Sequence, residues 1–208
     1  FVAHARVDEL DPALFACFGR AWLSGAGLDG TLWDIKPPGI FWINALGLGF
    51  GGGSRIGVAL LCALALSGSV CAIGILGWRG HGRWVGALGA VLAAVYLPHF
   101  DFHVGGNRPV TFVVLCEALA LVGYLRAWRE PRRRVMFLWL CGAACGSSLL
   151  FKQNALALPL ALTLHLVWRR RAWADGGGSL VSAISALVGS GWAVLGLGVC
   201  GMAPVSYT

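Results

Sequence analysis

Residues 55–77, RIGVALLCALALSGSVCAIGILG, decide the fold class, because this stretch carries no charge after Arg55. A helix needs about 20 apolar residues to cross a bilayer. Five further apolar runs follow it, at 84–98, 109–125, 135–151, 155–168 and 179–200. We therefore predict an all-α integral membrane protein, a multispan helical bundle with about six spans in this sequence.

The overall composition supports a membrane protein. Hydrophobic residues make up 58% of the chain and charged residues 12%, whereas soluble domains carry about a quarter charged residues. Cys141 and Cys145 lie among Gly and Ala residues, so we predict that they are small packing residues. The chain begins at Phe1 and ends at Thr208 after an apolar run, and we expect an N-terminal fragment of a longer protein that is inactive alone.

The distribution of charge predicts the topology. Ten of the sixteen Lys and Arg residues cluster in three connections, around 79–83, 126–134 and 169–171. By the positive-inside rule these connections face the cytoplasm. The net charge of +7 is then explained by anionic lipid headgroups, and no nucleic-acid partner is needed. The outward side receives residues 1–54, the loop at 99–108 and a tight turn near 152–154.

The first outward region is divided by Gly and Pro into short pieces. Residues 13–23 have the apolar spacing of a helix lying on the membrane surface. Residues 39–50 are apolar but too short to span. We divide the chain into residues 1–54, the end of a preceding span plus an outer catalytic loop with juxtamembrane helices, and residues 55–208, the transmembrane bundle.

Lys36 stands at the start of the second of these short helices. In the sequence WDIKPPGIFW (33–42), Pro38 suits the first position of a helix, so Lys36 is placed beside a helix N-terminus. Free N–H groups, the helix dipole and an ammonium together favour an anion such as a lipid phosphate. A lysine that extends to the headgroups before an ordinary surface helix is the other interpretation, and both stay open on physical grounds. Asp11, which precedes Pro12, is expected to cap a helix.

Several short motifs resemble the GT-C glycosyltransferases, especially the bacterial protein-mannosyltransferase-like and aminoarabinose-transferase-like groups. An acidic pair at Asp8 and Glu9 is followed by Asp34-Ile35-Lys36-Pro37-Pro38-Gly39, and a glycine-rich helix at 142–146 is followed by Lys152 and Gln153. The specific motifs occupy about a fifth of the chain, although the layout is similar over most of it. Enzymes of these groups usually have more spans.

The resemblance implies transfer of a sugar from a polyprenyl-phosphate carrier to an acceptor glycan, lipid or protein at the outer face of a bacterial cytoplasmic membrane. Asp8 would be the general base that takes the proton of the acceptor hydroxyl, with Glu9 as the next candidate. Lys36 would stabilise the leaving phosphate. Further donor-binding candidates are Asp34, Asp101, Asn107, Arg108, Lys152 and Gln153. No cofactor or metal is implied, because the lipid-linked sugar is a substrate.

The second outer loop departs from the pattern of these groups. Gly105-Gly106-Asn107 is followed by Arg108, where the groups often carry an acid. Whether Asp101 substitutes for that acid stays open. His99, Asp101 and His103 would face one way in an extended segment and could grip a metal, which is the weaker interpretation.

One feature keeps another class of function open. Glu117 falls inside an apolar run, where an ionisable group usually faces a partner or a cavity. A non-enzymatic transporter or permease subunit is therefore the alternative function. The sequence shows no internal repeat and no pair of interrupted helices, which transporters commonly have.

Overall fold

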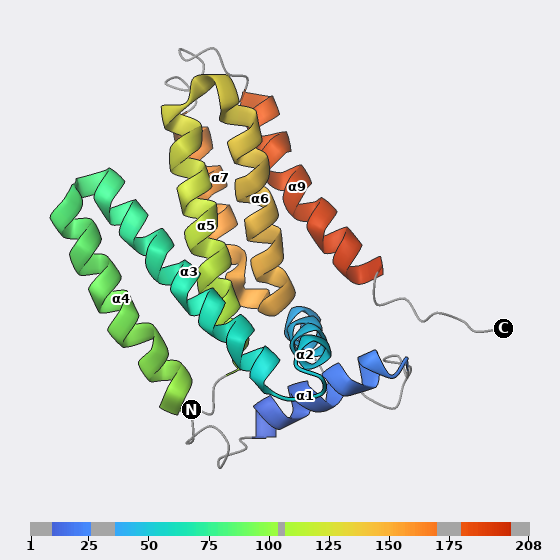
Figure 1. Cartoon of the computed structure of the whole chain (residues 1–208). Coiled ribbons are helices and arrows are strands. Elements are labelled where there is room, and N and C mark those ends of the chain that lie inside the picture. Colours follow the sequence, from blue (N-terminus) through green and yellow to red (C-terminus); the bar gives the residue numbers. More distant parts are fainter. Residues whose placement is uncertain (1–9, 26–35, 104–106, 170–179, 201–208) are drawn as a thin grey trace.

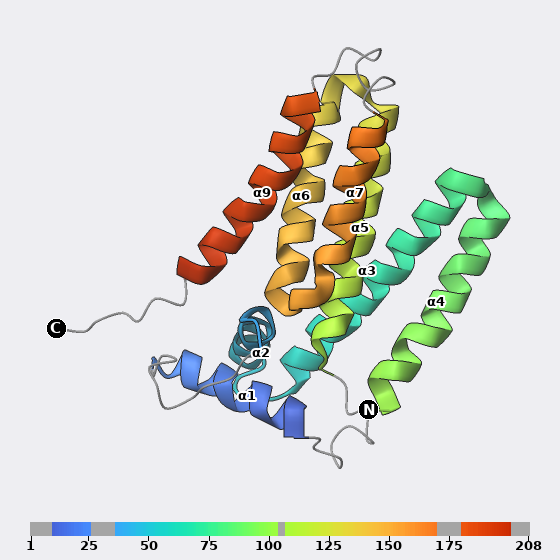
Figure 2. The same ribbon diagram turned by 180° about the vertical axis from the view of Figure 1, so that it is seen from behind.

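The structure is a computed structural model that describes residues 10–25, 36–103, 107–169 and 180–200. Over these ranges the chain forms helices and no strand, which confirms the predicted all-α class. The long helices run alternately up and down, and two short helices cross one end of the bundle (Figures 1 and 2). The helices are α1 (Leu10–Leu23), α2 (Gly39–Phe50), α3 (Ile56–His81), α4 (Arg83–His103), α5 (Pro109–Arg129), α6 (Arg134–Phe151), α7 (Ala157–Trp168) and α9 (Leu180–Cys200).

Three segments of the described chain are long and apolar enough to cross a membrane. They are α3, α5 and the stretch Pro131–Phe151, which contains α6. The predicted run at 155–168 forms a helix of only 12 residues, because residues 153–156 make a 3-10 turn first. Twelve residues extend about 18 Å, against about 30 Å of bilayer hydrocarbon. The membrane bundle is confirmed, and the count of six spans is not.

Arginines collect at one end of the bundle, where α3, α5 and α7 terminate. Arg79 lies in the last turn of α3, Arg126 and Arg129 lie in the last turn of α5, and Arg169 follows α7. We call this end the arginine end. The helices α1 and α2 lie at the opposite end, together with the turn between α6 and α7 (Figure 1).

Buried side chains form two apolar clusters along the bundle. The larger cluster joins α5, α6, α7 and α9, and its fully buried members include Leu138 and Leu166. The second joins α1, α2, α3 and the start of α5 around Phe41. This second cluster lies at the end away from the arginines. It holds the short helices α1 and α2 against α3 and α5.

The packing of α6 against α9 explains the small residues predicted at 141–146. Cys141 and Cys145 are 0% and 3% exposed, which confirms them as packing residues. A Cβ on Gly146 would lie 2.5 Å from the carbonyl oxygen of Gly191 on α9. The hydrophobic effect does little to hold two helices together in lipid, so α6 and α9 depend on this close packing of their backbones.

We expect Gly146→Leu to separate α6 from α9 and to destabilise the protein by about 1–3 kcal/mol, the usual cost of overpacking. The measurement is thermal unfolding in detergent. Gly189→Leu is the matched control, because a Cβ on Gly189 of α9 meets nothing within 4 Å. Equal losses for the two variants would contradict the close packing at Gly146.

Candidate functional site

The helices α1 and α2 pack together through aromatic side chains at the end opposite the arginines. Phe18 stacks on Phe41 with ring centroids 4.7 Å apart, and Phe15 meets the same ring edge-on at 5.9 Å. Phe15, Phe18 and Phe41 are each 2% exposed or less. This packing fixes the side of α1 that carries Phe15 and Phe18 against α2.

Asp11 lies one helical turn before Phe15, and its carboxylate meets Lys36. The Oδ1 atom of Asp11 is 2.8 Å from the Nζ atom of Lys36. The same ammonium lies 4.7 Å from the centroid of the Phe15 ring. The side chain of Lys36 is 31% exposed and that of Asp11 is 62% exposed, so the ion pair is open to ligands.

This contact corrects the prediction for Asp11, which was expected only to cap a helix. In the structure Asp11 lies within the first turn of α1, and it is the ionic partner of Lys36. Asp11, Phe15 and Phe18 follow the i, i+4, i+7 pattern of one helix face, but this spacing does not identify Lys36 as the partner of Asp11. The acid therefore lies on the same side of α1 as Phe15 and Phe18, at the exposed end of the contact with α2.

Lys36 precedes the N-terminus of α2, as predicted. The helix begins at Gly39, with the amide of Phe41 donating to the Pro38 carbonyl at 3.0 Å. Pro38 occupies the capping position, one residue earlier in helix numbering than expected. A Cβ on Gly39 would lie 2.7 Å from the carbonyl oxygen of Leu150 at the end of α6. Only a residue without a side chain fits this approach.

Through Gly39, the Lys36 segment comes close to the Lys152 segment. Leu150 and Phe151 end α6, and Lys152 follows directly in an extended conformation. Lys152 and Gln153 are both exposed. Two segments that are more than a hundred residues apart in sequence thus bring cations to the same end of the bundle. Such an end favours an anion electrostatically.

The second outer loop is tied to α2 by a reciprocal pair of amides. Asn107 donates to the Oδ1 atom of Asn44 at 2.8 Å, and Asn44 donates in return at 3.1 Å. Asn44 is fully buried and also donates to the Ile40 carbonyl at 2.8 Å. Asn107 has a left-handed backbone, with φ of 55°. Arg108 is half-buried and precedes α5.

Asn44 is a residue that our sequence analysis missed. Its signal was a single amide inside the apolar helix 39–50. A buried polar side chain in such a place is nearly always hydrogen-bonded to something specific. Here the partner is the predicted site residue Asn107, so Asn44 positions the second outer loop on α2.

We expect Asn44→Ala to leave the Asn107 amide without this partner and to lower stability by about 1–3 kcal/mol. Thermal unfolding of Asn44→Ala, Asn107→Ala and the double variant gives their coupling energy, expected at about 0.5–3 kcal/mol. Asn154→Ala, at an exposed position of the same end, is the control. Strict additivity of the two single changes would contradict the reciprocal pair.

Some predicted site residues lie outside the described part of the chain. These are Asp8, Glu9 and Asp34, and the side chain of Asp101. The backbone of α4 is helical through His103. The metal interpretation of His99, Asp101 and His103 depended on an extended segment. That premise is wrong, because these residues belong to a helix.

Glu117 lies inside α5, one of the three candidate spans, and is half-buried. It is far along the helix from Arg108, which marks the site end of α5. Glu117 is thus placed within the bundle and away from the Lys36 site.

Comparison with known proteins gives the family. No curated protein and no solved structure matches the chain. The family model described as dolichyl-phosphate-mannose-protein mannosyltransferase matches residues 35–194, which is more than half of the chain. The match begins just before Lys36 and covers α2 to α7 and most of α9. The chain therefore belongs to the dolichyl-phosphate-mannose-protein mannosyltransferase family and is a membrane glycosyltransferase.

Proposed function

We propose that this glycosyltransferase moves a sugar from a polyprenyl-phosphate-linked donor to an acceptor at the outer face of a bacterial cytoplasmic membrane. The observation that carries the proposal is the contact between Lys36 and Asp11 at the end opposite the arginines. The Lys36 ammonium can bind a phosphate, and the Asp11 carboxylate can accept the proton of a hydroxyl group. Family membership, which separates the chain from transporters, supports the same conclusion.

Lys36 is proposed to bind the donor phosphate and to stabilise it as the leaving group. Its ammonium precedes the N-terminus of α2, whose first N–H groups and dipole also favour negative charge. Lys152 adds a second cation at the same end, and Arg108 at the start of α5 a third. Negative charge grows on the phosphate as the glycosidic bond breaks, so these groups act most strongly in the transition state.

The base is proposed to be a carboxylate of the segment 8–11. The resemblance to GT-C enzymes favours Asp8, whereas the contact with Lys36 favours Asp11, and we propose Asp11. When the phosphate takes the ammonium, the Asp11 carboxylate is released beside it. The acceptor hydroxyl then gives its proton to Asp11, its oxygen bonds to the anomeric carbon, and the electron pair of the broken bond leaves with the phosphate oxygen.

Polar groups around this centre are proposed to bind the sugar. The Asn107 and Gln153 amides offer donors and acceptors that match sugar hydroxyls. Asp34 and Asp101 stay proposals from the resemblance, and Glu9 stays a proposed partner of the base. No cofactor enters this scheme.

The arginine end supports the proposed outward orientation of the Lys36 site. Cationic connections are retained in the cytoplasm, so the end with Lys36 would face outward. The test uses membrane vesicles that contain the full-length protein, in right-side-out and inside-out preparations. Labelled polyprenyl-phosphate sugars and, separately, nucleotide sugars are supplied with cell-envelope acceptors.

We expect label to pass from a polyprenyl-phosphate sugar in right-side-out vesicles and from no nucleotide sugar. Vesicles that lack the protein are the control. Transfer directly from a nucleotide sugar would contradict the lipid-linked donor. Transfer from lipid-linked sugar only at the cytoplasmic face would contradict the orientation and leave the donor class intact.

A further inference from the structure

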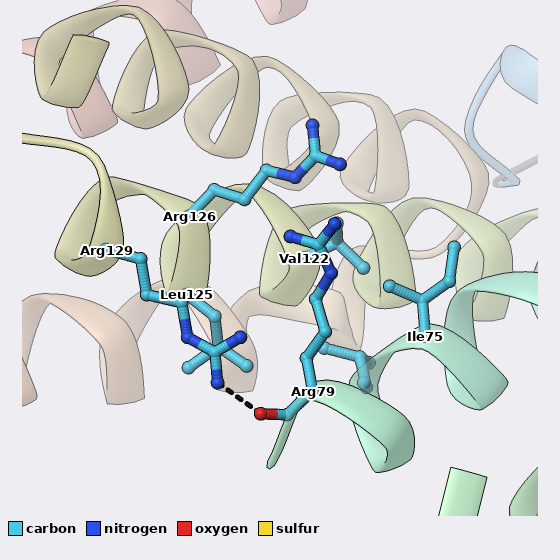
Figure 3. Close-up of a pocket in the computed structure, with 7 residues that line it drawn as sticks. Ile75, Arg79, Val122, Leu125, Arg126 and Arg129 are labelled. Carbon is cyan, nitrogen blue, oxygen red and sulfur yellow. Dashed lines mark hydrogen bonds between the residues drawn. The ribbon is translucent and has the colours of Figure 1, made fainter. Parts of the chain in front are cut away.

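A pocket lies between α3 and α5 at the arginine end (Figure 3). This is the end of the bundle away from α1 and α2. It has a volume of about 230 Å³, part of which is open to the surroundings. It is a shallow groove on the surface of the bundle rather than an enclosed cavity. Its lining residues are Ile75, Leu76 and Arg79 of α3, and Val122, Leu125, Arg126 and Arg129 of α5.

The cations of this pocket have no anionic partner among the described residues. Arg129 donates to the backbone carbonyl of Arg79, which joins the two helices through a neutral acceptor (Figure 3). The Nε atom of Arg126 is buried and has no hydrogen-bond partner within the described chain. Its guanidinium lies 5.7 Å from the centroid of the Phe137 ring. A buried donor without an acceptor is costly, and an anion in the pocket would offset the positive charge of this guanidinium.

Two exposed tryptophans beside the pocket indicate that it lies at the depth of the lipid headgroups. Trp78 and Trp84, which flank the turn from α3 to α4, are 65% and 75% exposed. Exposed tryptophans beside arginines are typical of the membrane interface. Ile75 lies one helical turn deeper than Arg79 on α3, and Val122 lies one turn deeper than Arg126 on α5. The pocket therefore has a cationic rim at the interface and apolar walls toward the hydrocarbon.

We propose that this pocket binds an anionic phospholipid, with the phosphate among Arg79, Arg126 and Arg129 and an acyl chain against Ile75, Leu76, Val122 and Leu125. A basic pocket between transmembrane helices fits the charge of such a headgroup. Arginine suits the phosphate because its planar fork donates two hydrogen bonds at once. The bound lipid bridges α3 and α5, and its role is separate from the sugar donor at the opposite end.

The test measures binding of dioleoylphosphatidylglycerol and dioleoylphosphatidylcholine to the full-length protein in detergent by native mass spectrometry. The first variant changes Arg79, Arg126 and Arg129 to Gln. Its matched control changes Arg83, Arg132 and Arg133 to Gln, which removes the same charge from the same end but from exposed positions that do not line the pocket. Val122→Phe fills the apolar part and keeps every arginine.

We expect phosphatidylglycerol to bind at least tenfold more tightly than phosphatidylcholine. The pocket triple variant and Val122→Phe should each weaken phosphatidylglycerol binding at least tenfold, and the control triple variant less than threefold. Val122→Phe keeps the test valid if the pocket triple variant does not fold. Equal losses in both triple variants, or equal binding of the two lipids, would overturn the proposal. Full competition by soluble glycerol 1-phosphate would also overturn it, because the acyl chain would then contribute nothing.

Discussion

Replacing Lys36 by Ala is expected to lower sugar transfer in membrane vesicles by about 10²–10³-fold, the usual effect of losing one preorganised group that stabilises a developing anion. The physical reason is the loss of the ammonium that precedes the N-terminus of α2 and contacts Asp11. The readout is initial transfer from the labelled polyprenyl-phosphate sugar, normalised to folded protein in the vesicles.

Arg20→Ala is the control for Lys36→Ala. Arg20 lies in the last turn of α1 and is exposed. Its replacement by Ala removes one cation from the same end of the bundle. We expect its activity to stay within about twofold of the wild type, because screened surface charges contribute little. Lys36→Ala retaining more than a tenth of wild-type transfer would show that Lys36 does not hold the leaving group.

Asp11→Asn is expected to lower transfer by about 10²–10⁴-fold, the range over which a general base usually acts. The amide keeps the size of the side chain and cannot accept the proton of the acceptor hydroxyl. The fold should survive, since a partly exposed ion pair contributes only about 0–1 kcal/mol. The measurement compares initial rates at saturating donor with thermal unfolding of the same preparations.

Two neighbouring carboxylates provide the comparison for Asp11. We expect Glu9→Gln and Asp8→Asn to lower transfer less than Asp11→Asn, because the contact with Lys36 belongs to Asp11. A larger loss in Asp8→Asn than in Asp11→Asn would move the base to Asp8, as the resemblance alone suggested. It would leave Asp11 as a residue that only positions Lys36.

Much of the fold could be predicted because long apolar runs leave few alternatives. The run at 55–77 forms α3, and the short apolar stretch 39–50 forms α2 with the same ends. In both cases the backbone must hydrogen-bond internally in a membrane, so a helix is the natural outcome. The length of the helix in the run 155–168 could not be predicted in this way, since the 3-10 turn after Lys152 shortens it to twelve residues.

The site was less predictable because it depends on contacts between distant segments. Lys36 was recognised from Pro37 and Pro38, whose effect on the following helix is local. Its partner Asp11 was not, because the pairing requires Phe15 and Phe18 to pack on Phe41 first. The amide pair of Asn44 and Asn107 likewise joins α2 to the second outer loop across sixty-three positions of sequence. No local pattern encodes such distances.

The ion pair of Lys36 and Asp11 also bears on how the enzyme tells its donor from the bulk of the leaflet. A bare ammonium at headgroup depth would attract every phospholipid, and those lipids vastly outnumber any sugar carrier. With Asp11 2.8 Å away, the resting site is nearly neutral, so its long-range attraction for ordinary headgroups is largely cancelled. The pair is partly exposed and costs only about 0–1 kcal/mol to open. A lipid-linked sugar gains extra hydrogen bonds from its sugar to the surrounding polar groups, and these offset the cost of opening the ion pair. Ordinary phospholipids lack these bonds, so the ion pair selects against them.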